Sequence, residues 1–223
     1  MNKEVTLNKI EIENLNKDKK DLSSKSFKNT NLSNIYLVNA KLINANFEKC
    51  NLSEASLYGA NLSGSNMFKA NLKNANLKNA NLSNVNLLGS NLDGTKLENV
   101  NWGKDNKVIN ELDAERLYSL GQFKESISKY REAEEVYRSI KISMQSQTLG
   151  DDTGKFFIRE MICKRKQFNK LSTARIGSKI IEITTGYGER LSNIVFTVIG
   201  IIIVCMLLYG IEGISYQDKV IGF

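Results

Sequence analysis

The side chains of this 223-residue chain that could perform acid–base, nucleophilic or metal chemistry form no recognisable nucleophile–base pair or metal cluster. The sequence contains no histidine, which excludes histidine general bases, histidine-based triads and histidine metal ligands. Its cysteines, Cys50, Cys163 and Cys205, form neither a disulfide framework nor a CxxC metal motif. We therefore predict no catalytic residue, no metal site, no cofactor and no small-molecule substrate, and we expect that the protein is not an enzyme.

The chain is dominated instead by a pattern with a period of five. Every fifth residue from Phe27 to Trp102 is large and apolar, and the residue two places earlier is usually small, as at Ala40, Cys50 and Ala75. A period of five fits neither an α-helix nor a flat strand, so the backbone must turn a corner at each repeat. The large residues expected in the core of this coil are Leu32, Leu37, Leu42, Phe47, Leu52, Leu57, Leu62, Met67, Leu72, Leu77, Leu82, Leu87, Leu92 and Leu97.

Asparagine usually precedes each large residue, as at Asn51, Asn71 and Asn91. We place these asparagines at corners, because the carboxamide bonds to nearby backbone and the residue tolerates left-handed geometry. Four five-residue sides would close one coil of about twenty residues, and successive coils would stack by backbone hydrogen bonds at about 4.8 Å. Cys50 occupies a position that alanine fills elsewhere, so we interpret it as a core residue and not as a reactive thiol.

The segment ANLSGSNMFKANLKNANLKNANLSNVNLLGSNL resembles the pentapeptide-repeat family, whose motif is A(N/D)LXX. The resemblance covers residues 22–102 and implies a right-handed quadrilateral β-helix, a solenoid with its central and small residues pointing inward. Such a solenoid is stabilised by contacts between neighbouring coils, and its ends need caps. Residues 1–21, with alternating apolar residues from Val5 to Ile12, are expected to form the N-terminal cap as a strand or a short helix.

The composition changes after the repeats. The predicted β-helix domain spans residues 22–105, residues 103–109 have the composition of a linker, and a cytoplasmic α-helical region is expected over 106–190. Its first helix is predicted over residues 111–120, with Asn110 as N-cap, because acidic residues follow in the first turn.

Two further helices are predicted, over residues 122–148 and from residue 151 onward. Their apolar spacing of three and four residues indicates amphipathic helices that must bury one face. The expected apolar stripes are Phe123, Ile127, Tyr130, Ala133, Tyr137, Ile140 and Met144 on the second helix, and Phe157, Met161, Phe168 and Leu171 on the third. The region resembles tetratricopeptide-type hairpins over about one and a half repeats, and either a structural hairpin or a peptide-binding groove would fit it.

Residues 191–211 form an uncharged apolar stretch. As a helix it would be about 31 Å long, enough to cross a bilayer core, so we predict one transmembrane helix followed by a short extracytoplasmic tail at 212–223. Residues 155–190 carry nine Lys/Arg and three Asp/Glu, a net charge of +6, and the residues after the span carry −1. The positive-inside rule therefore predicts a single-pass protein of the cell membrane with its N-terminal domains in the cytoplasm. The basic residues expected at the membrane surface are Lys164, Arg165, Lys166, Lys170, Arg175, Lys179 and Arg190.

The sequence TTGYGE at Thr184–Glu189 resembles the selectivity filter of potassium channels, T-V-G-Y-G-D, but lacks the valine and has glutamate for aspartate. We interpret it as a turn before the span. More broadly, the order of repeats, YRSIKISMQSQ, GKFFIREMICKRK, GYGER and a span resembles pentapeptide-repeat proteins that end in a two-span ion-channel module. In that architecture a pore loop and a second span would follow Ile214. The sequence ends at Phe223, so we expect either a truncated or split channel or a relative reduced to an anchor.

Two classes of function compete. The first is a non-enzymatic, membrane-anchored scaffold for an unidentified protein partner, which would include the cytoplasmic portion of a split channel and leaves a homo-oligomer open. The alternative is a gyrase-binding DNA mimic, a role of some pentapeptide-repeat proteins. Residues 22–105 carry nine Lys and five Asp/Glu, a net charge of +4, which is opposite in sign to the phosphate charge that a mimic must copy. The outward face is expected to lack aromatic residues between the basic ones, so no nucleic-acid partner is expected.

Overall fold

The computed structural model of this chain describes residues 9–19, 21–147, 150–212, 214–216 and 219–221. These residues form two compact units, which meet in the sequence between Gln167 and Phe168. The first unit contains helix α1, the repeats and helices α2 to α4, and the second contains helices α5 and α6 and a short hairpin. The domain boundary expected after residue 105 therefore falls inside the first compact unit.

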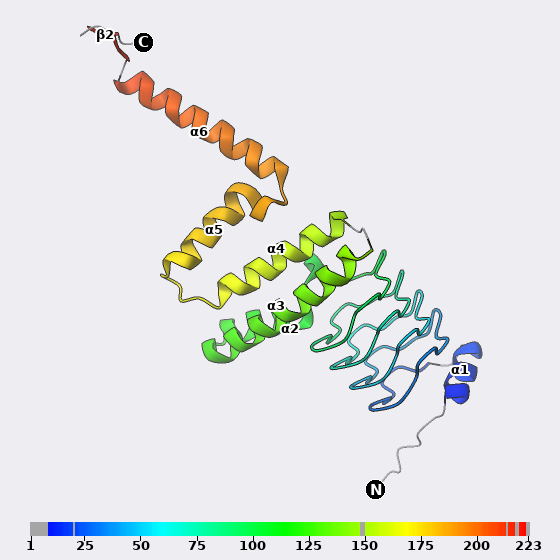
Figure 1. Cartoon of the computed structure of the whole chain (residues 1–223). Helices are drawn as coiled ribbons and strands as arrows, with labels where there is room; N and C mark the ends of the chain where they lie inside the picture. Colours follow the sequence, from blue (N-terminus) through cyan, green and yellow to red (C-terminus); the bar gives the residue numbers. More distant parts are fainter. Residues whose placement is uncertain (1–8, 20, 148–149, 213, 217–218, 222–223) are drawn as a thin grey trace. The chain divides into compact units, whose positions relative to one another are not determined.

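The repeats form a solenoid whose coils are joined by parallel backbone bridges between residues twenty positions apart (Figure 1). One row of bridges pairs Asn31 with Asn51, Asn51 with Asn71, and Asn71 with Asn91. A constant spacing of twenty residues means that four five-residue sides close each coil. Each side contributes a single bridge, because the chain turns again before a longer strand can form. The predicted β-helix-like solenoid is confirmed.

The large residue at the centre of each side is buried inside the solenoid. The fourteen residues predicted for this core are each at most 4% exposed. Leu22, Phe27 and Trp102 continue the buried row at its ends, and the rings of Phe27 and Phe47 stack with their centroids 5.0 Å apart. Cys50 is buried among them, as expected for a residue in an alanine position.

The left-handed residues lie two positions after each central residue and not at the asparagine before it. Asn34 and Asn74 have φ of 57° and 58° at this position, and Gly59 and Gly64 have 65° and 70°. Our placement of left-handed geometry at the preceding asparagines was therefore wrong. Asparagine and glycine recur at the later position because a left-handed backbone costs most other residues about 1–2 kcal/mol.

The asparagines before the central residues form side-chain hydrogen bonds instead. Asn51 accepts a hydrogen bond on Oδ1 from the backbone N–H of Ser53 at 3.2 Å, which confirms the predicted bond to nearby backbone. Its Nδ2 donates to Oδ1 of Asn31 at 3.0 Å, and Nδ2 of Asn71 donates to Oδ1 of Asn51 at 3.1 Å. A ladder of side-chain amides therefore runs beside the backbone ladder on this side of the solenoid.

Helix α1 (Lys9–Lys17) covers the first coil, so the N-terminal cap is helical. Ile12 is fully buried, and side chains of α1, among them Lys9 and Glu13, bond to the open backbone edge. Lys9 donates from Nζ to the carbonyl oxygen of Ser33 at 2.8 Å, and Glu13 accepts on Oε1 from the backbone N–H of Tyr36 at 2.9 Å. The earlier apolar residues of the expected alternation, among them Val5, lie outside the described residues.

Three helices cover the other end of the solenoid. A 3-10 turn, η1 (Lys104–Asn106), leads into α2 (Ile109–Ser119), followed by α3 (Phe123–Gln145) and α4 (Gly150–Lys166). The core is continuous across this junction, because the ring of Trp102 lies 5.2 Å from that of Phe156, which lies 6.0 Å from Tyr137. Figure 1 shows α3 and α4 side by side next to the last coil.

Several helical predictions are corrected by the structure. Helix α2 begins one residue before Asn110, which is not an N-cap; its Nδ2 instead donates to Glu132 Oε2 at 2.9 Å. Phe123 begins α3 but is exposed, although most of the expected stripe after it is buried.

The face predicted for α4 was also wrong. Phe157 and Met161 are only partly buried, and the helix ends before Phe168 and Leu171, which are both exposed. The residues of α4 that enter the core are instead Phe156, Ile158 and Cys163.

The second unit begins after Gln167. Helix α5 (Thr173–Thr185) is followed by a 3-10 turn, η2 (Gly186–Gly188), and by α6 (Leu191–Glu212). Strands β1 (Ile214–Tyr216) and β2 (Lys219–Ile221) pair antiparallel after it. Of the expected tail at 212–223, residues 213, 217–218 and 222–223 lie outside the described residues.

Candidate interaction surface

A buried polar cluster lies where the solenoid meets the helices. Tyr137 donates a hydrogen bond from its hydroxyl to Glu111 Oε2 and accepts one from the backbone N–H of Val108 at 3.0 Å. Arg159 donates from Nη1 to Glu111 Oε1 at 3.3 Å and from Nη2 to the carbonyl oxygen of Asp105 at 2.8 Å. The cluster thereby joins α2, α3, α4 and the linker after the last coil.

Titratable groups in and beside this cluster are perturbed by burial. Burial raises the pKa of Glu111, and the hydrogen bond from Tyr137 and the charge of Arg159 oppose that rise. Burial also raises the pKa of the Cys163 thiol. A perturbed carboxyl beside a cleft is a candidate acid or base, but Glu111 is only 1% exposed and both of its oxygens have partners. We therefore assign this cluster to the structure of the junction. The described residues contain no group of three or more His, Cys, Asp or Glu placed to hold a metal ion.

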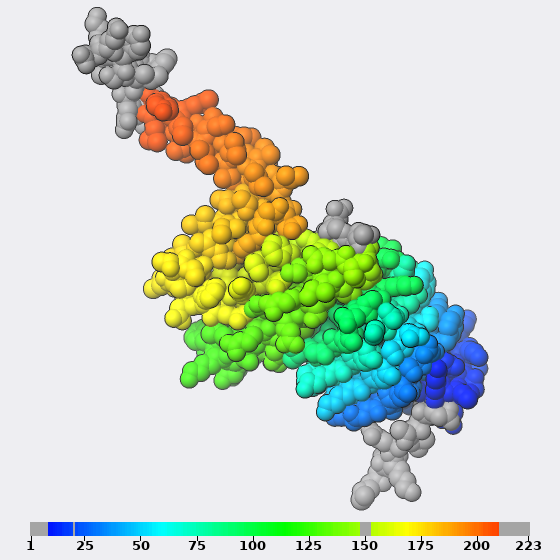
Figure 2. Space-filling view, viewed as in Figure 1, coloured from blue at the N-terminus to red at the C-terminus, as the bar shows by residue number. Residues whose placement is uncertain are grey.

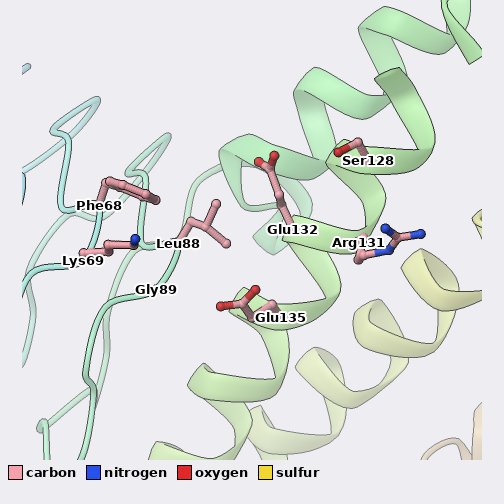
Figure 3. Close-up of a pocket in the computed structure, with 8 residues that line it drawn as sticks. All are labelled: Phe68, Lys69, Leu88, Gly89, Ser128, Arg131, Glu132 and Glu135. Carbon is pink, nitrogen blue, oxygen red and sulfur yellow. The ribbon is translucent and has the colours of Figure 1, made fainter. Parts of the chain in front are cut away.

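A groove of about 270 Å³ lies between the solenoid and α3 (Figure 3). One wall is formed by residues of two successive coils, and the other by the N-terminal half of α3. Figure 3 shows Leu88 pointing toward α3, with Glu132 and Glu135 on the facing helix. We call this the coil–helix groove. The residues that line it are Phe68, Lys69, Leu88, Gly89, Ser128, Arg131, Glu132 and Glu135.

The two walls of the coil–helix groove differ in chemistry. Phe68 and Leu88 provide apolar surface, and Lys69 Nζ lies 5.1 Å from the centre of the Phe68 ring. On α3, Glu132 already accepts hydrogen bonds from Asn110 at 2.9 Å and Lys129 at 2.7 Å, which fix its carboxylate. Glu135 is exposed and presents a second carboxylate. One wall of the groove is therefore apolar apart from Lys69, and on the other wall two carboxylates outnumber the single cation of Arg131.

We did not predict this groove from the sequence, although two residues in the sequence indicate it. Phe68 and Leu88 are twenty residues apart, each directly after a central residue, where most repeats have a polar residue or glycine. Bulky apolar residues in that outward position indicate a covered side of a solenoid. Tyr36 and Tyr58 are also exposed on the outward face of the solenoid.

The seven basic residues expected at a membrane surface are divided between the two units. Three lie in the last turn of α4, where Lys164 is exposed, Lys166 is partly buried and Arg165 is only 5% exposed. Because it is buried, Arg165 cannot contact a lipid surface, and the prediction was wrong for this residue.

The other four basic residues belong to the second unit. Lys170, Lys179 and Arg190 are exposed, and Lys179 Nζ lies 3.0 Å from Glu182 Oε2. Arg175 is partly buried and donates from Nη1 to the carbonyl oxygen of Phe168 at 2.8 Å.

Helix α6 is the largest exposed apolar surface of the described chain. Residues Leu191–Tyr209 have a mean hydropathy of 2.7, and none of that stretch is buried inside the structure. The space-filling view shows α6, in orange, as an uncovered rod within its unit (Figure 2). By length and composition, this helix can cross a membrane. In the segment Thr184–Glu189 before it, Thr184 and Thr185 end α5 and Gly186–Gly188 form the turn η2, so the predicted turn is limited to the later residues, with Gly186 and Tyr187 left-handed.

Comparison with known proteins supports the interpretation of the repeats. The family model of pentapeptide repeats matches residues 30–67 and 65–101. A crystal structure of a pentapeptide repeat protein from the cyanobacterium Cyanothece 51142 is 41% identical over 40% of this chain and 60% of its own, with a TM-score of 0.39. A pentapeptide repeat protein from the Arabidopsis thaliana thylakoid lumen is 28% identical over 44% of this chain and 73% of its own, with a TM-score of 0.22. No curated protein matches the chain.

Proposed function

We propose that this pentapeptide-repeat chain is a non-enzymatic scaffold, anchored in the cell membrane by α6, whose solenoid and helices α2 to α4 bind a partner protein in the cytoplasm. The observation that carries the anchor is the uncovered apolar surface of α6 (Leu191–Glu212). A core helix of a soluble protein is buried by the elements around it, whereas no part of Leu191–Tyr209 is buried by the described chain. Apolar surface of this extent leaves water by entering a bilayer.

The charges on either side of α6 support the orientation. Lys164, Lys166, Lys170, Lys179 and Arg190 precede the helix and are at least partly exposed. Basic residues close to a span are retained on the cytoplasmic side. The N-terminal end of α6 therefore faces the cytoplasm, together with the solenoid.

The coil–helix groove supports the scaffold part of the proposal. Its apolar wall at Phe68 and Leu88 and its acidic wall at Glu132 and Glu135 suit a segment that carries one apolar and one basic side chain. The alternative of a gyrase-binding mimic gains no support, because residues 22–105 carry a net charge of +4. The channel-like relation rests on the sequence resemblance, and we assign the turn at Thr184–Glu189 no conducting role.

The anchor is tested by fractionation and labelling in cells. In a Cys205→Ser background, we expect the chain to stay with membranes after alkaline carbonate extraction and to be released by detergent. A cysteine at Ser215 should react with an impermeant maleimide on intact cells, and one at Ser172 should react only after lysis, because the two lie on opposite sides of α6. Recovery of the chain in the soluble fraction, or labelling of Ser172→Cys from outside, would contradict the anchor or its orientation.

The groove is tested by site-specific crosslinking. A photoreactive residue at Leu88 should form a discrete adduct with a partner, and Leu88→Glu should abolish binding of that partner because it places a charge against Glu132 and Glu135. Ser53→Glu is the matched control, because Ser53 also follows a central residue and gains the same charge. Equal binding by Leu88→Glu and Ser53→Glu would show that the groove does not bind the partner.

A further inference from the structure

Helix α5 (Thr173–Thr185) carries three isoleucines that are each at least half exposed. Ile176, Ile180 and Ile183 are spaced four and three residues apart, so they lie on one side of the helix. They are 50%, 55% and 62% exposed, within the 46% to 79% range of the exposed large apolar residues on α6. Lys179 flanks this face on one side, with Glu182 farther round the helix, whereas Ile181, also exposed, projects about 130° from the centre of the face.

Helix α5 does not continue along the axis of α6. Gly186 ends α5 in a left-handed conformation, Tyr187 is also left-handed, and the chain bends sharply before Leu191 (Figure 1). A helix that bends away from the axis of a span cannot share its path across the bilayer, so it must run along the bilayer surface or leave it.

Side chains of α6 fix this bend. Asn193 donates from Nδ2 to the carbonyl oxygen of Ile183 at 3.1 Å, and Thr197 donates from Oγ1 to that of Thr184 at 2.9 Å. Tyr187 and Ser178 also share a hydrogen bond, 2.7 Å between their hydroxyl oxygens. The last turn of α5 is therefore held against the first two turns of α6, at the level where α6 would enter the lipid.

We propose that α5 is an interfacial helix whose isoleucine face lies in the cytoplasmic leaflet of the bilayer that α6 crosses. The inference rests on the proposed anchor and adds a second, separate contact with lipid. An amphipathic helix in this position buries its apolar face at the boundary between headgroups and acyl chains. Lys179 beside the isoleucines and Arg190 at the bend reach the anionic headgroups, as basic side chains near a membrane do.

The test is a depth measurement on the full-length chain in vesicles that contain phosphatidylglycerol. Cys205 is replaced by serine, while Cys50 and Cys163 are buried and remain. One nitroxide is then attached at Ile180→Cys on the isoleucine face, at Glu182→Cys on the opposite side of the same helix, or at Ile199→Cys in α6. Power saturation with oxygen and with a water-soluble nickel chelate reports whether each label lies in lipid or in water.

We expect the ratio of oxygen to nickel accessibility to be several-fold higher at Ile180 than at Glu182 and highest at Ile199. Nickel accessibility at Ile180 equal to that at Glu182, with Ile199 still in lipid, would overturn the interfacial helix and leave the anchor intact. A label at Ile180 shielded from both reagents would also overturn it, because protein would then cover the face. Nickel access at Ile199 would overturn the anchor and this inference together.

Discussion

The side chain of Gln147 accepts a hydrogen bond on Oε1 from the backbone N–H of Leu97 at 3.2 Å. Its Nε2 also donates to the carbonyl oxygen of Thr95. Inside the solenoid, a single residue of the next coil makes the two equivalent hydrogen bonds with its backbone. The N–H of Lys96 donates to the carbonyl oxygen of Ala75 at 2.9 Å, and its carbonyl oxygen accepts from the N–H of Leu77 at 3.0 Å. The carboxamide of Gln147 therefore takes the place of a peptide group that a further coil would supply.

Gln147→Ala should destabilise the compact unit that ends at Gln167 by about 1–2 kcal/mol, because the N–H of Leu97 loses its partner and the carbonyl of Thr95 keeps only its bond from Ser143 Oγ, at 3.2 Å. Gln147→Glu should be no better, since a carboxylate accepts from Leu97 but cannot donate to Thr95. Urea unfolding of the 1–167 fragment measures the change. Gln145→Ala, at an exposed position of α3, is the control. Equal midpoints for the Gln145 and Gln147 variants would rule out this cap.

Leu72→Asp should cost several kcal/mol, because it places an unpaired charge in the dry core of the coil. Lys73→Asp, one residue later and exposed, should cost less than about 0.5 kcal/mol. Thermal unfolding followed by circular dichroism separates the two. Similar losses for both variants would contradict the register of the repeats.

Gly64→Ala should destabilise the solenoid by about 1–2 kcal/mol, since alanine at a φ of 70° is strained and its Cβ would meet the carboxamide of Asn44. Ser63→Ala, at the preceding position, should change stability by less than about 0.5 kcal/mol. Denaturant midpoints of the two variants compare them directly. An unchanged midpoint for Gly64→Ala would show that the turn does not require left-handed geometry.

Glu111→Gln should flatten the pH dependence of stability. The pKa of Glu111 is raised in the folded state, so between the unfolded value of about 4.5 and the higher folded value the native chain holds the extra proton. That difference stabilises the wild type most at acidic pH and is lost as pH rises through the folded pKa. The stability of wild type relative to Glu111→Gln should therefore fall from pH 4 to pH 8, as measured by urea unfolding. A difference that is constant, or that grows with pH, would contradict the raised pKa.

The solenoid was predictable because its period is local and strict. Each side of a coil has one central residue, and these residues recur every five positions, so Leu32 and Leu97 can be identified by counting along the sequence. The corner was misplaced because asparagine occupies both the position before the centre and the position two after it. Composition does not separate the asparagine that forms a side-chain ladder from the one that is left-handed; only the backbone does.

The candidate surface was harder to predict because it depends on contacts between distant segments. The coil–helix groove brings Leu88 to α3, and nothing near either in sequence indicates the other. The prediction of the buried face of α4 was wrong for a related reason. Phe156 and Phe157 are equally apolar, and only packing against Trp102 and Tyr137 determines that Phe156 is the buried one. The exposed apolar helix α6 was easier to predict, because its length and apolar character depend only on local composition.

The twenty-residue coil also makes the distance between the two ends of the solenoid adjustable in fixed steps. Helix α1 bonds to the first coil at Ser33, Tyr36 and Val38, and Gln147 bonds to the last coil at Thr95 and Leu97. Removing or duplicating one whole coil between them would leave both sets of bonds unchanged and move the ends by about 4.8 Å. The repeats can therefore act as a spacer of selectable length, which insertions of whole coils lengthen without redesign of either cap.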